Sequence, residues 1–172
     1  MKKVSVGIFI IIVFVVFGLW SSGKDTRVVI TEIVISASPD KVWNVLANID
    51  EWKNWSPIIK DSEGKAAQGA RLIITMISDE GKTGKPGPKY EPTITIFKPF
   101  ENITWTASMG ANFIMTNGKV LELQSTSIGT KLIHKETFSG IMIPFIWGRV
   151  QENVPKMLES MNEALKKIVE EN

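Results

Sequence analysis

The chain has 172 residues, 44% of them hydrophobic, with six tryptophans and eight phenylalanines. This composition excludes a disordered chain and is enough for the core of one domain. Cysteine is absent, which excludes disulfides, thiolate metal sites and cysteine nucleophiles. The formal net charge is +2, and outside Lys2 and Lys3 the 18 remaining basic side chains balance 18 acidic ones. A neutral domain lacks the basic surface of a nucleic-acid-binding protein, so we expect no nucleic-acid partner.

An uncharged apolar run, Val4 to Trp20, follows the two N-terminal lysines. As a helix, this run would span about 26 Å, close to the ~30 Å hydrocarbon core of a bilayer. We therefore predict a membrane anchor or signal segment over residues 1–23, with an N-terminal transmembrane helix as the main interpretation, and a folded domain over residues 24–172. The lysines favour a cytoplasmic N-terminus and a domain outside the cytoplasm. The small residues Ser21 to Gly23 leave secretion after signal cleavage as the alternative.

A strand, two short helices and five more strands are predicted in the first part of the domain. β-Branched residues predict a strand over Val28–Ser36, and the Ser38-Pro39-Asp40 sequence is typical of a helix start. A second short helix carries Trp52 and Trp55 and ends at Pro57. Apolar alternation and short turns predict an antiparallel meander. Its expected strands are Arg71–Ser78, Glu91–Lys98, Asn102–Ala107, Phe113–Gln124 and Thr130–Ser139.

Two further segments complete the expected organisation. Gly81 to Pro88 is rich in glycine and proline and is predicted to be a solvated loop. Apolar residues at steps of three and four predict a long amphipathic helix from Val150 to Ile168. Pro155 is expected to kink this helix or to delay its start. The element order predicts an α+β fold in which a curved antiparallel sheet wraps around the C-terminal helix.

The register of the last two strands follows from their turn. If Ser125 pairs with Thr130, Lys119 lies directly opposite Glu136. Because an unpaired buried charge is costly, these two side chains are expected to form an ion pair on the concave face. The open alternative places both near the end of the sheet, where water half solvates them.

Several segments of the sequence, in their order, resemble one superfamily. They are Ser38-Pro39-Asp40-Lys41-Val42-Trp43, Trp52-x-x-Trp55-x-Pro57, Ile103-x-Trp105 and Gly129-Thr130-Lys131-Leu132-x-His134-x-Glu136-x-Phe138-x-Gly140. The chain resembles the SRPBCC superfamily, which includes START and Bet v 1 proteins and the polyketide cyclase/dehydrase and lipid-transport group. The resemblance runs from about Val28 to Val169. It implies a helix-grip fold with a cavity for an apolar small molecule between the sheet and the C-terminal helix.

Alternation along the strands and the apolar face of the helix supply the candidate ligand-binding residues. These candidates are Trp55, Ile74, Met76, Ile94, Ile96, Ile103, Trp105, Met115, Lys119, Leu121, His134, Glu136, Phe138, Val154, Leu158 and Met161. A filled core requires the same residue types, so a domain without a useful cavity remains the alternative.

The main functional hypothesis is non-catalytic binding or transport of a small hydrophobic ligand, including lipid-like molecules. One alternative is a cyclase or hydrolase-type enzyme that uses His134 or Glu136 as acid or base. Another is a structural or protein-interaction module. His134 is the only histidine, so no metal site is expected, and no phosphate-binding glycine pattern predicts a cofactor. The sequence predicts no oligomeric state.

Overall fold

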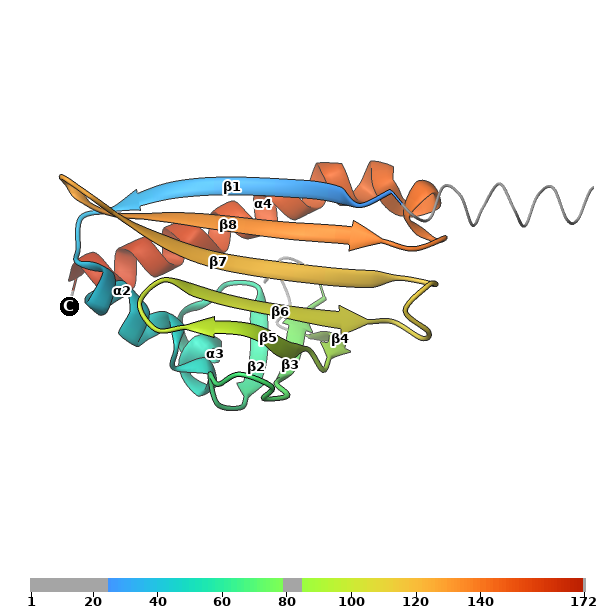
Figure 1. Cartoon of the computed structure of the whole chain (residues 1–172), viewed down its shortest axis with the longest axis horizontal. Helices are drawn as coiled ribbons and strands as arrows, with labels where there is room; N and C mark the ends of the chain where they lie inside the picture. The colour runs from blue at the N-terminus through green and yellow to red at the C-terminus, as the bar shows by residue number, and fades with distance from the viewer. Residues whose placement is uncertain (1–24, 79–84, 172) are drawn as a thin grey trace, which may run out of the picture.

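The computed structural model describes residues 25–78 and 85–171 (Figure 1). Five strands form an antiparallel sheet in the order β1–β8–β7–β6–β5, called here the large sheet. Its strands are β1 Arg27–Ile35, β5 Thr93–Lys98, β6 Asn102–Ser108, β7 Thr116–Thr126 and β8 Gly129–Ser139. Three shorter strands form the small sheet in the order β2–β3–β4. These strands are β2 Ile59–Glu63, β3 Ile73–Ile77 and β4 Pro86–Tyr90.

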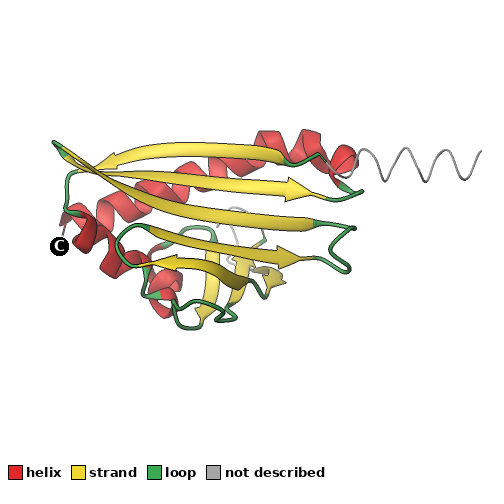
Figure 2. Ribbon diagram, in the orientation of Figure 1, coloured by secondary structure: helices red, strands yellow, loops and turns green. Residues whose placement is uncertain are grey.

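Three short helical segments and one long helix complete the domain. They are α2 Pro39–Leu46, η1 Ile49–Glu51, α3 Trp52–Trp55 and α4 Ile143–Glu171. Helix α4 runs along one face of the large sheet, and the short helices lie near the C-terminal end of α4 (Figure 2). An antiparallel sheet with a long C-terminal helix on one face is an α+β arrangement of the helix-grip kind, as the sequence predicted.

The two sheets are joined by backbone hydrogen bonds just before β3. The Gly69 N–H donates to the Ile94 carbonyl over 2.9 Å, and the Ile94 N–H donates to the Ala70 carbonyl over 2.8 Å. The Leu72 N–H donates to the Pro92 carbonyl over 2.8 Å. These bonds attach the segment before β3 to the edge strand β5. The small sheet therefore continues the wall of the large sheet and bends it around one side of α4.

Strands β2 and β4 correct the predicted element order. The sequence of β2, IKDSE, has no apolar alternation, and it forms a strand because β3 pairs with it. The Gly81–Pro88 segment was expected to be a loop, yet β4 begins at Pro86. Because β4 is an edge strand, its prolines can face away from the sheet without breaking a hydrogen-bonded ladder. Neither strand carries the pattern that identifies strands in a sequence.

The register of the β7–β8 hairpin is as predicted. Ser125 pairs with Thr130, and Lys119 pairs with Glu136. Helix α4 starts at Ile143, well before Pro155, so this proline does not delay the start. The hydrogen bond lost at the proline nitrogen is tolerated inside a long helix that packs against β1 and β8.

Two hydrophobic clusters fill the space between the sheet and α4. The larger cluster includes Trp43, Trp52 and Leu165 and lies toward the C-terminal end of α4. The smaller cluster includes Phe138 and Val150 and lies toward its N-terminal end. Dividing the core in this way leaves room for a cavity where the clusters meet.

The predicted anchor over residues 1–23 lies outside the described residues and stays a prediction. Among the helices of residues 25–78 and 85–171, none combines the length and the apolar character needed to cross a bilayer.

Candidate functional site

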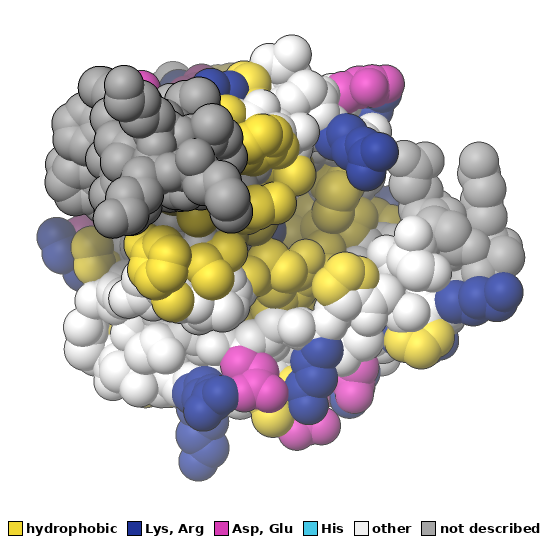
Figure 3. Space-filling model, turned by 90° about the vertical axis from the view of Figure 1, so that its right-hand side faces the viewer, with side chains coloured by type: hydrophobic (Ala, Val, Ile, Leu, Met, Phe, Trp, Pro, Cys, Tyr) yellow, Lys and Arg dark blue, Asp and Glu magenta, His cyan; other side chains and the backbone are white. Residues whose placement is uncertain are grey.

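A cavity of about 250 Å³ lies between the large sheet, the small sheet and the N-terminal half of α4. The small sheet contributes Ile74 and Met76, and α4 contributes Val150, Val154 and Met157. Figure 3 shows hydrophobic side chains gathered around a hollow at the end of the molecule where β1 begins. The volume is slightly below the roughly 300–1,000 Å³ that is usual for small-molecule pockets. The cavity therefore suits a compact apolar ligand.

The structure brings half of the sequence-predicted site residues together on the cavity wall. They are Ile74, Met76, Trp105, Met115, Lys119, Glu136, Phe138 and Val154. Others are buried in the core away from the wall. These are Ile94, Ile103, Leu121, His134, Leu158 and Met161. Trp55 packs at the side of the larger cluster, half buried.

The placement of the buried group follows from the length of the hairpin. Leu121 and Phe138 face the same side of the sheet, as alternation requires. Phe138 lies in the half of the hairpin that borders the cavity, whereas Leu121 lies in the half that the larger cluster fills. Alternation identifies the concave face but not the part of that face that stays open.

Ile96 is the one candidate that lies on the outside of the sheet. Its side chain is 43% exposed, although Ile94, two residues earlier, is buried. The register of β5 against β6 shifts between these residues, since Ile94 pairs with Trp105 and Ile96 pairs with Thr104. Such a bulge turns the following side chain to the opposite face and corrects the expectation that Ile96 points inward.

The sequence reasoning missed several wall residues, for two reasons. Ala107 and Asn117 line the cavity at positions two residues beyond Trp105 and Lys119 on the same strands. Continuing the alternation along the strands would have found them. Tyr90 belongs to β4, and no sequence signal identified that strand. The remaining missed wall residues are Trp52, Ile58, Ile59, Pro92, Val150 and Met157.

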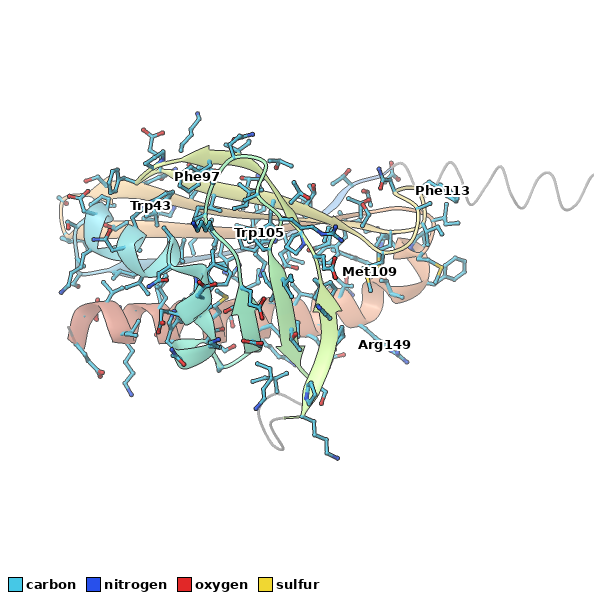
Figure 4. All side chains as sticks on the ribbon, turned by 90° about the horizontal axis from the view of Figure 1, so that it is seen from below. Trp43, Phe97, Trp105, Met109, Phe113 and Arg149 are labelled. Atoms are coloured by element: carbon cyan, nitrogen blue, oxygen red, sulfur yellow. The ribbon has the colours of Figure 1, made fainter. Side chains whose placement is uncertain are left out.

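Lys119 and Glu136 form an ion pair on the cavity wall. Lys119 Nζ lies 2.7 Å from Glu136 Oε1, and the two side chains are only 11% and 13% exposed. Asn117 Nδ2 donates to Glu136 Oε2 over 3.2 Å. Lys119 Nζ also lies 5.9 Å from the centre of the Trp105 ring, within the range of a cation–π interaction. Figure 4 shows Trp105 on the side of the large sheet that faces the small sheet.

In this arrangement, protein groups compensate both charges. Each ionised group has the other as its partner, and each has one further polar or aromatic contact, so burial is tolerated. Among the residues of 25–78 and 85–171 that line the cavity, only Lys119 and Glu136 carry charged side chains. The charges on this described part of the wall therefore cancel.

Tyr90 faces the ion pair from the small sheet. Burial raises the pKa of the Tyr90 hydroxyl, and the negative charge of Glu136 raises it further. This hydroxyl has no hydrogen-bond partner within residues 25–78 and 85–171. It is therefore a protonated donor on a cavity wall that otherwise offers few donors.

His134 takes part in a buried network away from the cavity wall. Its Nδ1 lies 2.8 Å from Asn162 Oδ1, and Asn162 Nδ2 donates to Thr31 Oγ1 over 2.9 Å. Because the Asn162 oxygen accepts, His134 Nδ1 carries the proton. Burial lowers the pKa of His134 well below its usual range, the charge of Lys119 lowers it further, and the bond to Asn162 opposes the shift. A neutral imidazole thus ties β8 to α4 and, through Asn162, to β1.

The arrangement of a sheet, a long helix and an apolar cavity has counterparts among known proteins. The model of a family described as "Polyketide cyclase / dehydrase and lipid transport" matches residues 26–170. The chain belongs to this family. Membership places it in the SRPBCC superfamily that the sequence resembles, and in a fold that binds hydrophobic ligands. No curated protein matches the chain.

Solved structures share the fold of this polyketide cyclase/dehydrase and lipid-transport family member. Ara h 8.0201 matches with a TM-score of 0.67 at 18% identity, covering 86% of this chain and 100% of that one. The di-domain ARO/CYC StfQ from the steffimycin biosynthetic pathway matches with a TM-score of 0.70 at 10% identity, covering 85% and 52%. Protein MLL2253 from Mesorhizobium loti matches with a TM-score of 0.62 at 20% identity, covering 82% and 98%. At these identities the likeness shows the fold alone.

In this family member, the site offers hydrogen bonds and apolar contact. No group of three His, Asp or Glu side chains in residues 25–78 and 85–171 lies close enough together to hold a metal ion. The polar groups that a ligand can meet are those of Asn117, Lys119, Glu136 and Tyr90.

Proposed function

We propose that the domain binds one small hydrophobic molecule in the cavity beneath β6–β8 and carries it without chemical change. The observation that carries this proposal is the cavity itself, whose walls are apolar except for one neutralised ion pair and two polar side chains. Burial of apolar ligand surface there is worth about 25 cal/mol per Å². No catalytic step is proposed, because His134 does not line the cavity and Lys119 holds Glu136.

The dimensions of the cavity support a compact ligand. About 250 Å³ accommodates a molecule of one or two rings or a short chain, and not a whole two-chain lipid. Met76, Met115 and Met157 on the wall are flexible and polarisable, so they can adapt to ligands of different shape.

The test is to identify the molecule that co-purifies with the domain. A fragment of residues 24–172 is expressed in cells, and native mass spectrometry is followed by extraction of bound small molecules. A stoichiometric apolar adduct supports the proposal. An empty protein that also ignores apolar probes such as naphthalene would contradict it.

We also propose that residues 1–23 hold the domain at a membrane, with the domain outside the cytoplasm. Exposed apolar side chains at one end of the domain support this location. Met109 and Phe113 lie there, and Phe113 is 62% exposed (Figure 4). Met142 and Phe145 follow β8, with Phe145 67% exposed.

This apolar end is the end at which the chain enters the domain. Arg27, the first residue of β1, pairs with Phe138 near the end of β8. The Ile141 N–H donates to the Phe113 carbonyl over 3.0 Å, so the loops that carry the exposed side chains lie together. A membrane segment just before β1 would bring the apolar end, and with it the hollow of Figure 3, close to the bilayer.

Fractionation of cells that express the full chain tests this location. A chain that stays with membranes through alkaline carbonate and is digested by protease added from outside the cytoplasm supports it. A mature protein whose measured mass corresponds to a chain that begins near residue 24 would instead show secretion after cleavage. A chain found in the soluble cytoplasmic fraction would contradict both.

A further inference from the structure

The polar groups of the cavity are gathered in one place. Asn117, Lys119 and Glu136 come from adjacent strands β7 and β8, and Tyr90 faces them from β4. We call these four side chains the polar cluster. The remaining wall residues are apolar, including Ile74 and the other residues that α4 and the small sheet contribute. A ligand in the cavity therefore meets hydrogen-bonding groups over one part of its surface only.

The charge of the polar cluster limits the charge of the ligand. Lys119 and Glu136 neutralise each other at 2.7 Å, and the part of the chain that the structure describes places no other charged side chain on the wall. A carboxylate or ammonium on the ligand would add a third charge without a counterion. Burying an uncompensated charge is far more costly than burying a hydroxyl or a carbonyl group.

The polar cluster also has hydrogen-bonding capacity that residues 25–78 and 85–171 leave unused. An ammonium group has three donors, and Lys119 uses one for Glu136 and turns toward the Trp105 ring. The hydroxyl of Tyr90 has no partner within residues 25–78 and 85–171. A pure hydrocarbon would cover these groups and replace none of their hydrogen bonds to water. Leaving buried donors without partners costs free energy and weakens binding.

We propose that the ligand is an uncharged apolar molecule that carries a hydroxyl or carbonyl group, and that this group hydrogen-bonds to the Lys119–Glu136 pair. The inference rests on the proposed ligand-binding function and narrows it to one chemical class. A carbonyl or hydroxyl oxygen accepts from Lys119 Nζ or from the Tyr90 hydroxyl, and a hydroxyl hydrogen donates to Glu136. Carboxylates such as fatty acids, and amines, are expected to bind poorly.

The experiment compares three probes that share one skeleton: naphthalene, 2-naphthol and 2-naphthoate. The full chain is placed in phospholipid nanodiscs with ¹³C-methyl methionine, and each probe is titrated at pH 7, where 2-naphthol is uncharged. Met76 and Met115 line the cavity and report binding there. Met109 and Met142 are exposed and report non-specific contact. A hydrogen bond to a charged group corresponds to about a tenfold gain, so 2-naphthol should bind about tenfold more tightly than naphthalene.

Two variants change the charge of the wall in known ways. Glu136→Gln leaves Lys119 without a counterion, so the preference should reverse and 2-naphthoate should become the tightest of the three probes. The double variant Lys119→Met with Glu136→Met removes both charges, so the preference for 2-naphthol over naphthalene should fall at least severalfold while naphthalene still binds. An unchanged signal from Met161, which is buried in the core, shows that a variant keeps its fold.

The outcomes separate the inference from the function on which it rests. Tight binding of 2-naphthol with weak binding of 2-naphthoate supports the inference. If 2-naphthoate binds the unaltered chain as tightly as 2-naphthol, or if all three probes bind alike, the neutral-ligand inference is wrong and the apolar-ligand function stands. If not even naphthalene shifts Met76 and Met115, the proposed function itself fails.

Discussion

Replacement of His134 should change how the stability of the domain depends on pH. The imidazole is buried, and its pKa in the folded protein lies well below its usual value. In the unfolded chain the pKa returns to about 6.5. The unfolded chain therefore binds more protons than the folded protein as the pH falls below 6.5. The contribution of neutral His134 to stability is fully present above this pH and is lost as the pH falls toward the folded pKa.

The size of the effect follows from linkage. With an unfolded pKa of about 6.5 and a much lower folded pKa, moving from pH 7.5 to pH 5.5 should lower the free energy of unfolding by about 1.4 kcal/mol. His134 is the only histidine in the chain. Asp61, whose pKa is lowered from 3.8, and Tyr90, whose pKa is raised from 10.0, both titrate outside this range.

Urea unfolding of residues 24–172, followed by tryptophan fluorescence at pH 7.5, 6.5 and 5.5, measures the slope of the free energy of unfolding against pH. His134→Gln is the matched variant, since its side-chain amide can still donate to Asn162 and does not titrate. The variant should lose the slope, whatever its stability at pH 7.5. An equal slope in the variant, or no slope in the unaltered domain, would refute the assignment of a buried neutral imidazole.

Three further sets of substitutions test the ion pair, two glycine positions and the cavity by urea unfolding and probe binding. Lys119→Met alone should lower the free energy of unfolding by about 3 kcal/mol because it leaves Glu136 unpaired, whereas the double variant with Glu136→Met should lie within about 1 kcal/mol of the unaltered domain. Gly148→Ala should raise stability by about 0.5–1 kcal/mol because a Cβ there meets nothing within 4 Å, and Gly140→Ala should lower it because φ is 119° and the Cβ would overlap a backbone carbonyl. Ala107→Leu should fill the cavity and abolish naphthalene binding without lowering stability; retained binding would show that the probe binds elsewhere.

The parts of the site that could be predicted depend on local rules. The β7–β8 register follows from a short turn and from period-two alternation. These local features place Lys119 opposite Glu136 without any knowledge of the tertiary structure. The long helix follows from its apolar periodicity. Both features are decided by residues close together in the sequence, so one sequence is enough to find them.

The parts that could not be predicted depend on long-range packing. The bulge in β5 that turns Ile96 outward is fixed by its pairing with β6, and β4 exists because β3 offers it an edge. Asn162, the partner of His134, lies 28 residues away on α4. No local pattern reveals which inward residues meet a neighbour and which border a cavity.

One face of the β7–β8 hairpin shows two ways to bury polar groups. In the filled half, His134 stays neutral and is held by Asn162, so no charge needs a partner. In the half that borders the cavity, Lys119 and Glu136 stay charged and compensate each other. The first solution suits a core that is closed to solvent and to ligands. The second keeps donors and acceptors available at a surface that a ligand can reach. We therefore expect the ion pair, and not the histidine, to determine ligand specificity.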